Sequence, residues 1–207
     1  MKIILATNNE HKLSEIRSIF DNNIEVLSMK DVGIDADIEE NGETLLENSR
    51  IKAVYVTMQL KKMNFPYPYT VIADDTGLIV EALNGEPGVH SARYAGGEGH
   101  DSEANMQLLL KNLNGCKNRK AYFSTIVTLI EERASFLSHM MFFEGRVNGT
   151  ILTEKHGTEG FGYDPIFQPD GYNCSFAELG MEIKNKISHR AIAIGKVADY
   201  LAKIKIG

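Results

Sequence analysis

The chain lacks tryptophan and contains only two cysteines, Cys116 and Cys174, among its 207 residues. Two cysteines far apart, with no metal-ligand spacing around them, exclude a disulfide framework and a cysteine-based zinc site. No apolar run approaches the roughly 18 residues that a membrane span requires, and the first residues show none of the regions of a signal peptide. We therefore expect a cytoplasmic protein with reduced thiols and no membrane partner.

Positive charge is also scarce, since 22 lysines and arginines face 28 aspartates and glutamates, for a formal net charge of -6. An acidic chain disfavours DNA or RNA as the main partner. A small anion can still bind where a few basic side chains gather, helped by a divalent cation. The length predicts one domain, residues 1–207, with a core of its own.

Apolar segments alternate with amphipathic ones, which predicts an α/β fold. Strands are expected at 2–6, 25–27 and 70–73. A helix is expected to follow the polar turn after the first strand and to end at about residue 20, and another to run from residue 44 to about 60. Further along, the pattern predicts a helix after Asp101, a hairpin of strands 121–130 and 134–147 that turns at 131–133, and helices capped by Ser175 and Ser188.

The first strand runs directly into a polar turn and a helix start, a junction that often holds anions in α/β proteins. Thr7, Asn9 and Lys12 could supply a hydroxyl, an amide and an ammonium to a phosphate group. The alternative is purely structural, because Asn8 or Asn9 would also serve as the N-cap of the following helix. The local pattern leaves both interpretations open.

Asp74 and Asp75 follow the strand 70–73 and precede the hydroxyl of Thr76. Adjacent carboxylates repel each other, so they are typical of places where Mg²⁺ neutralises them or where a water molecule must be activated. The alternative is an aspartate turn that closes the strand.

Two loci lie near the C-terminus. Glycines flank Phe161, so its ring could lie open on a loop and stack on a base, with Asp164 nearby to accept hydrogen bonds; alternatively the ring is tucked into the core. His189 and Arg190 open the last helix, where cations oppose the helix dipole. This pattern suggests an electron-rich ligand. The alternative is a solvated helix start that binds no ligand.

Taken together, these segments resemble the inosine triphosphate pyrophosphatase family. The resemblance covers nearly the whole chain and keeps the order of the motifs. It is carried by ATNNEHK at 6–12, ENG at 40–42 with Thr44, Glu47 and Asn48, ADDTGL at 73–78, PG at 87–88 with SARY at 91–94, GFGYDP at 160–165 and ISHR at 187–190. Thr76 stands where the family usually has serine, and it keeps the hydroxyl.

The resemblance implies an elongated mixed β-sheet flanked by helices, with two lobes around a central cleft, and a homodimer. It implies Mg²⁺-dependent hydrolysis of ITP, dITP and XTP to the monophosphate and pyrophosphate, which clears deaminated purines from the nucleotide pool. Phe136, Met140, Met141, Phe142 and Phe143 are interpreted as packing either the sheet or the dimer contact.

The resemblance also assigns roles to residues. Asp75 would be the catalytic carboxylate, as base or metal ligand, with Glu40 helping to hold Mg²⁺ and Asp74 in support. The triphosphate would be bound by Thr7, Asn9 and Lys12, with Lys52 as a further cation. The substrate-binding segment at this turn also includes Asn8, Glu10 and His11. Thr76 would touch the substrate, and the purine would be bound by Phe161, Gly162, Tyr163, Asp164, Lys184, His189 and Arg190. All of these are expected to converge on one groove.

The chemistry of the residues agrees with these roles. Release of pyrophosphate needs a water molecule to attack the α-phosphorus and positive charge to stabilise the departing oxyanion, tasks that suit Asp75 and Lys12. Donors such as His189 and Arg190 favour an oxygen at the purine six position over the amino group of adenine. Two alternatives remain: a pyrophosphatase for modified pyrimidine or methylated nucleotides, and a regulator that senses nucleotides without hydrolysis.

Overall fold

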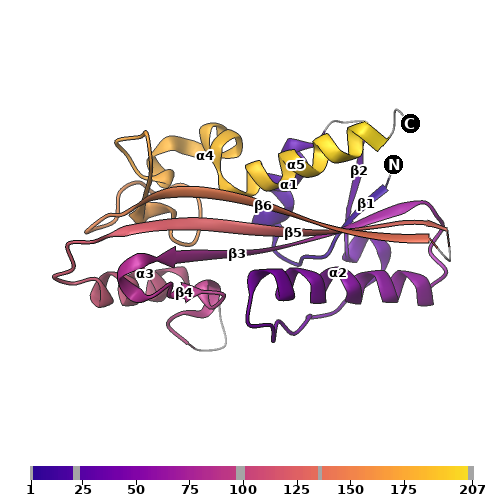
Figure 1. Ribbon diagram of the computed structural model, residues 1–207, viewed down its shortest axis with the longest axis horizontal. Coiled ribbons are helices and arrows are strands. Elements are labelled where there is room, and N and C mark those ends of the chain that lie inside the picture. Colours follow the sequence, from indigo (N-terminus) through magenta and orange to yellow (C-terminus); the bar gives the residue numbers. More distant parts are fainter. Residues whose placement is uncertain (1, 21–23, 97–100, 135–136, 205–207) are drawn as a thin grey trace. The chain divides into compact units, whose positions relative to one another are not determined.

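A computed structural model describes residues 2–20, 24–96, 101–134 and 137–204 (Figure 1). Its strands are β1 (Lys2–Leu5), β2 (Glu25–Ser28), β3 (Tyr69–Val80), β4 (Pro87–Gly88), β5 (Lys120–Ala134), β6 (Leu137–Ile151) and β7 (Phe167–Pro169). Its α-helices are α1 (Glu10–Ile19), α2 (Leu45–Lys62), α3 (Ser102–Asn112), α4 (Phe176–Ile187) and α5 (His189–Ile204). Within this part of the chain, no helix is both long and apolar enough to cross a membrane.

The strands form one mixed sheet in the order β2-β1-β3-β5-β6-β7, with β4 paired to β3. β1 is parallel to both of its neighbours, with Leu5 opposite Ser28 on β2 and Ile72 on β3. β4 and β7 pair antiparallel with β3 and β6. The mixed sheet flanked by helices confirms the fold class expected from the sequence.

The chain divides into two compact units, which are described separately below. Unit 1 comprises Met1–Asp75, Thr125–Glu144 and Ala191–Gly207, and unit 2 comprises Thr76–Ser124 and Gly145–Arg190. The boundary in β3 falls between two consecutive residues, Asp75 and Thr76.

Unit 1 buries both faces of its part of the sheet. Alternate residues of a strand point to opposite faces, and on β1 Ile3 and Leu5 pack with α1 and α5, whereas Ile4 packs with α2. Figure 1 shows the same arrangement, with α1 and α5 on one side of these strands and α2 on the other. Each fully buried aliphatic side chain contributes about 1.5–3 kcal/mol relative to exposure, so this double layer holds the strand ends firmly in place.

The helix starts follow the predicted capping patterns. Asn9 is the N-cap of α1, and its Oδ1 accepts a hydrogen bond from the Lys12 backbone N–H at 3.1 Å. Thr44 caps α2 and Ser175 caps α4, each in a complete capping box with the glutamate three residues later. These caps satisfy backbone N–H groups that a helix start leaves unpaired.

Unit 2 has its own core, centred on aromatic rings. Phe123 meets Phe167 edge to face at a centroid distance of 4.7 Å, and Phe167 stacks on Phe176 at 5.3 Å. Leu109 of α3 and Ile166 of a short 3-10 turn are fully buried in the same cluster. The cluster fixes the segment that carries Phe161 to Asp164, because Ile166 and Phe167 anchor its end.

Two boundaries differ from the prediction. The turn predicted at 131–133 is wrong, because these residues belong to β5; Glu131 and Glu132 are buried and paired with cations, whereas the prediction assumed that charges mark an exposed turn. β3 extends to Val80, so Asp74 and Asp75 lie inside a strand, just beyond the stretch of β3 that pairs with β1. Phe136 lies outside the described residues.

Candidate functional site

The start of α1 in unit 1 places a cation next to the first aspartate of β3. The Lys12 ammonium lies 3.1 Å from Oδ2 of Asp74, whose side chain is almost completely buried. α1 begins immediately after the β1 turn, so Lys12 stands in the first turn of the helix above the sheet. The two residues form a partly buried ion pair on the α1 face.

The second aspartate points to the opposite face, because neighbouring residues of a strand alternate. Asp75 Oδ1 lies 3.5 Å from the ammonium of Lys52, which projects from α2. The same ammonium donates to Oε1 of Glu40 at 3.0 Å. Asp74 and Asp75 thus have different nearest cations, although the charge of Lys12 also acts on Asp75 and that of Asp74 acts on Lys52.

Asp75 is a buried carboxylate with an oxygen that accepts no hydrogen bond from the described residues. Burial raises its pKa, Glu40 and Asp74 add to the rise, and Lys52 and Lys12 oppose it. Its Oδ2 has no hydrogen-bond partner among the described residues. A carboxylate with a raised pKa and an available oxygen can orient a water molecule or bind a cation.

Lys52 remains positively charged despite its burial. Only 6% of the residue is exposed. Burial alone would lower its pKa, but the charges of Asp75, Glu40 and Asp74 outweigh this cost and raise the pKa above its ordinary value. Lys52 therefore offers a fixed positive charge on the α2 face of unit 1.

The predicted phosphate turn at the start of α1 is organised by its own side chains. Thr7 Oγ1 accepts from the backbone N–H of Asn9 at 3.1 Å, and Asn9 caps the helix. Asn8 Nδ2 donates to the Ala36 carbonyl at 2.9 Å, which fastens the segment that follows β2. The structural interpretation of Asn9 therefore holds. Glu10 and His11 are exposed in the first turn.

In unit 2, Asp164 links the loop of Phe161 to α4. Its Oδ2 accepts from the Phe161 backbone N–H at 2.8 Å and from the Lys184 ammonium at 2.7 Å. Gly160 has a φ of 80°, and a Cβ there would lie 2.3 Å from the same oxygen, so only glycine fits. The loop is therefore locked onto a buried ion pair.

Phe161 carries two cations beside its ring. The Lys184 ammonium lies 4.3 Å from the ring centroid and the Arg190 guanidinium 5.7 Å. The residue is neither fully exposed nor buried in the aromatic core of unit 2, so its position lies between the two predicted alternatives. An aromatic face with donors around it is suited to a flat, oxygen-bearing ring.

Arg190 and His189 are both buried at the start of α5. Arg190 Nη2 donates to Oγ1 of Thr76 at 3.3 Å, which connects it to the residue that follows Asp75 in β3. The His189 ring stacks on Phe123 at a centroid distance of 4.7 Å. Sequence reasoning missed Phe123, which is a core residue that orients a predicted site residue.

Two of the residues predicted to bind the purine, Gly162 and Tyr163, support the local fold. Tyr163 is buried in the core of unit 2, and its hydroxyl donates to the Ser91 carbonyl at 2.8 Å. Burial raises the pKa of the Tyr163 phenol, so it stays protonated. Gly162 has a φ of 65° and open space where a Cβ would be, so its contribution is a backbone turn.

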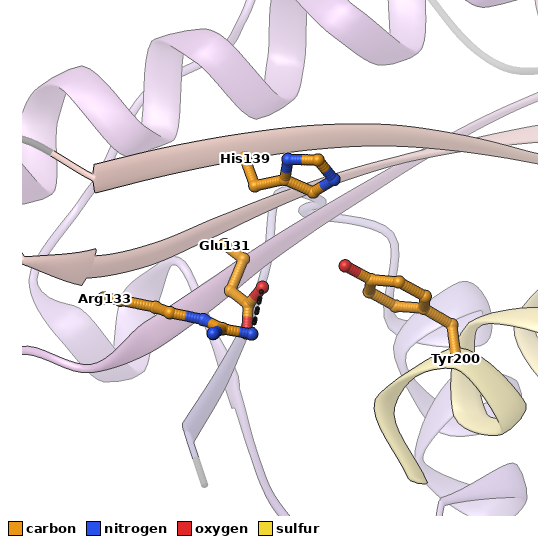
Figure 2. Close-up of a pocket in the computed structure, with 4 residues that line it drawn as sticks. All are labelled: Glu131, Arg133, His139 and Tyr200. Carbon is orange, nitrogen blue, oxygen red and sulfur yellow. Dashed lines mark hydrogen bonds and ion pairs between the residues drawn. The ribbon is translucent and has the colours of Figure 1, made fainter. Parts of the chain in front are cut away.

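A cavity of about 250 Å³ in unit 1 lies next to none of the predicted site residues that the structure describes. Figure 2 shows its lining side chains, with Glu131 and Arg133 paired on β5, His139 on β6 and Tyr200 on α5. Burial and the charge of Glu131 raise the pKa of Tyr200. The cavity belongs to the α5 face rather than the Lys52 face.

The residues described by the structure contain no group of three or more His, Cys, Asp or Glu side chains placed to hold a metal ion. Glu40 and Asp75 share Lys52 instead. Mg²⁺ is commonly bound by one or two carboxylates together with substrate phosphates and water. The pair Glu40 and Asp75 meets that lesser requirement.

Comparison with known proteins decides the family. A model of the Ham1 family matches residues 3–200. The chain belongs to the Ham1 family. It is 46% identical over 201 residues to the dITP/XTP pyrophosphatase of Porphyromonas gingivalis, a match that covers 97% of each chain. It is 48% identical over 206 residues to the dITP/XTP pyrophosphatase of Thermoanaerobacter sp. strain X514, covering 98% of each.

The fold of this Ham1-family chain also has solved counterparts. It matches the Ham1 protein of Staphylococcus aureus with a TM-score of 0.84 and 37% identity, over 99% of this chain and 100% of that one. The Coxiella burnetii HAM1 protein matches with a TM-score of 0.84 and 33% identity, over 98% and 99% of the two chains. The resemblance inferred from the motifs is confirmed.

Proposed function

We propose that this chain hydrolyses ITP, dITP and XTP to the corresponding monophosphate and pyrophosphate, and so removes deaminated purines from the nucleotide pool. The observation that carries the proposal is the buried Asp75, whose Oδ2 has no hydrogen-bond partner in the described part of the chain and whose Oδ1 lies near the ammonium of Lys52. The names of the full-length relatives, dITP/XTP pyrophosphatase, support the same substrates.

In this proposal unit 1 binds the triphosphate. Lys12 and Lys52 provide positive charge, and the start of α1 adds the positive end of a helix dipole. Asp75 orients the water molecule that attacks the α-phosphorus, and its raised pKa makes it a better proton acceptor than an ordinary aspartate. The bond between the α-phosphorus and its bridging oxygen breaks, and pyrophosphate leaves.

Mg²⁺ fits this site. Glu40 and Asp75 would hold the ion, because both present carboxylate oxygens at Lys52 and Oδ2 of Asp75 has no partner among the described residues. When bound, Mg²⁺ would neutralise charge on the phosphates as the leaving group departs. Asp74 supports the arrangement by holding the ammonium of Lys12, whose charge also acts on Asp75.

Purine recognition is assigned to unit 2. Phe161 offers its ring for stacking, and Lys184, His189 and Arg190 offer donors to an oxygen at the six position. Adenine would present an amino group there and leave buried donors unpaired, which costs about 1–3 kcal/mol for each group. This polarity favours a six-oxo purine over adenine.

The protein is also proposed to be a homodimer. Met140 and Phe142 are 38% and 46% exposed on β6, and Phe143, on the other side of the strand, packs on Tyr200 at 5.7 Å. Exposed apolar side chains on one strand face suit a contact with a second copy. Sedimentation equilibrium tests this proposal: a monomer mass at micromolar concentration contradicts it.

The decisive assay measures the products of hydrolysis. The purified chain is incubated with dITP, XTP, dATP and 5-methyl-UTP in Mg²⁺, and pyrophosphate and orthophosphate are measured separately. We expect pyrophosphate from dITP and XTP. Stepwise release of orthophosphate would overturn the proposed bond cleavage, and preferred turnover of 5-methyl-UTP would favour a pyrimidine enzyme.

The variant Asp75→Asn tests the role of Asp75, and Asp74→Asn is the matched comparison. The amide has the same shape and leaves Lys52 paired with Glu40, so the fold should persist. Loss of a base or water-orienting group lowers the rate by about 10²–10⁴-fold. Asp74→Asn should lose less, since Asp74 contacts Lys12 on the opposite face. Equal activity of wild type and Asp75→Asn would sink the assignment.

A further inference from the structure

Glu40 lies on a segment without regular secondary structure. Residues 34–42 form neither helix nor strand, and Glu40 is the residue in that segment that contacts Lys52. A carboxylate on such a segment needs other contacts to hold its position. The question is which residues of unit 1 fix the backbone beside it.

The beginning of α2 supplies these contacts. The Gly42 backbone N–H donates to Oδ1 of Asn48 at 2.8 Å, and the N–H groups of Glu43 and Thr44 donate to Oε2 of Glu47 at 2.8 and 3.0 Å. Three consecutive N–H groups of the incoming chain are therefore bound by two neighbouring side chains of the helix. Glu47 belongs to an ordinary capping box, but Asn48 extends the contact by one residue toward Glu40.

The chain passes so close to α2 at this point that only glycine fits. A Cβ on Gly42 would lie 2.6 Å from Cβ of Glu47 and 2.7 Å from Oδ1 of Asn48. Asn48 is fully buried, and its Nδ2 has no hydrogen-bond partner among the described residues. A buried amide that uses only its oxygen, and uses it on this segment, is unusual for a core position.

Asn48 and Lys52 lie one turn apart on α2, so they point the same way. Lys52 holds the carboxylate of Glu40, and Asn48 holds the backbone two residues later. The same helix face thus holds the side chain of Glu40 and the main chain two residues after it. Asp75 meets that face through Lys52.

We infer that Asn48 is a positioning residue for the Mg²⁺ site: by binding the Gly42 N–H it holds Glu40 where it can share a divalent cation with Asp75. The inference rests on the proposed function, and it assigns to Asn48 a role that acts through Glu40 alone. Residues that position metal ligands without touching the metal contribute about 10–100-fold to metal affinity.

The test measures binding of Mn²⁺, as a spectroscopic substitute for Mg²⁺, to the free protein by electron paramagnetic resonance. Asn48→Leu is close to asparagine in shape but lacks the acceptor, and it should raise the Mn²⁺ dissociation constant about tenfold. Asn48→Asp keeps an acceptor for the Gly42 N–H and should bind Mn²⁺ at least as tightly as the wild type. An unchanged dissociation constant in Asn48→Leu, or an equal loss in Asn48→Asp, overturns the inference.

Two further measurements separate positioning from general damage. In a Glu40→Gln background, Asn48→Leu should have no added effect on Mn²⁺ binding, because its target is already gone. Ser49→Ala is the matched control, since it removes a buried 2.7 Å hydrogen bond to Thr128 at the next position of the same helix. A fall in Mn²⁺ affinity in Ser49→Ala equal to that in Asn48→Leu would contradict a specific role.

The pyrophosphate assay keeps the two proposals apart. If the wild type releases pyrophosphate from dITP and Asn48→Leu binds Mn²⁺ normally, the inference alone fails. If the wild type does not bind Mn²⁺, or releases no pyrophosphate, the proposed function and its metal fail first. In the expected outcome, Asn48→Leu recovers most of its rate at high Mg²⁺ concentration.

Discussion

Lys184 and Asp164 form a buried ion pair with a nitrogen-to-oxygen distance of 2.7 Å, and both side chains are at least 96% buried. The carboxylate also holds the backbone of Phe161. Breaking a buried pair by removing one partner leaves an uncompensated charge in a poorly solvated place. The stability of unit 2 and the position of the Phe161 loop are therefore coupled.

Lys184→Met should destabilise the protein by about 3–5 kcal/mol, because Asp164 keeps its charge without its cation. Urea denaturation followed by circular dichroism measures this loss. Lys184→Met with Asp164→Asn should regain a large part of it. Lys186→Met is the surface control, since its pair with Glu182 is exposed to solvent and its loss should leave the urea midpoint nearly unchanged. Similar losses for Lys184→Met and Lys186→Met would refute this account.

Arg190→Met should reduce the discrimination between dITP and dATP. Arg190 is 2% exposed, and its donors are proposed to favour an oxygen at the purine six position. We expect the ratio of kcat/KM for dITP to that for dATP to fall by at least about tenfold. Arg146→Met is the control, because the Arg146 guanidinium lies over the ring of Tyr122, at 3.5 Å from its centroid, whereas that of Arg190 lies over Phe161. An unchanged ratio in Arg190→Met would remove Arg190 from base recognition.

Lys61→Met should destabilise unit 1. Glu132 is fully buried on β5, and the Lys61 ammonium lies 2.8 Å from its Oε1. Because Lys61 is 39% exposed, the expected loss is about 1–3 kcal/mol, below that of a fully buried pair. Adding Glu132→Leu should restore stability, since the buried charge is then gone. The thermal midpoint reports both changes, and a harmless Lys61→Met would show that the pair contributes little.

Asp31 should make stability depend on pH in the acid range. Hydrogen bonds from Ser28 hold the pKa of Asp31 below its ordinary 3.8, and Arg17 adds to the shift. A lowered pKa in the folded state contributes stability that is fully present above pH 3.8 and is lost as the pH falls through the folded value. The gap in urea midpoint between wild type and Asp31→Asn should therefore narrow below pH 3.8. A constant gap would contradict this linkage.

Local patterns predicted helix starts in both units. The N-caps Asn9 in unit 1 and Ser175 in unit 2 follow directly from residue type and spacing. Such features depend on neighbours along the chain, so sequence alone can predict them.

The turn predicted at 131–133 failed for a reason that lies outside the local sequence. Glu132 is buried because Lys61, which is distant in sequence, reaches it from α2. Glu131 is buried beside Arg133. A run of charged residues predicts an exposed turn. The partners that allow such residues to be buried in a strand come from tertiary packing.

The separation of the two aspartates onto opposite faces could have been foreseen from strand alternation. It was missed because β3 was expected to end at residue 73. The stacking of His189 on Phe123 could not have been foreseen, since the two residues are distant in sequence and meet only through the packing within unit 2. The role proposed for Asn48 needed the close approach of Gly42 to α2.

Lys12 and Lys52 are each paired with a carboxylate of the same unit, Lys12 with Asp74 and Lys52 with Glu40 and Asp75. An incoming anion therefore gains only the difference between its own interaction energy with the lysine and that of the internal carboxylate that it replaces. A lone phosphate has little to gain by that exchange, whereas a chain of three phosphates gains at several points at once. Such competition would limit inhibition by abundant inorganic phosphate and would favour dissociation of the monophosphate product.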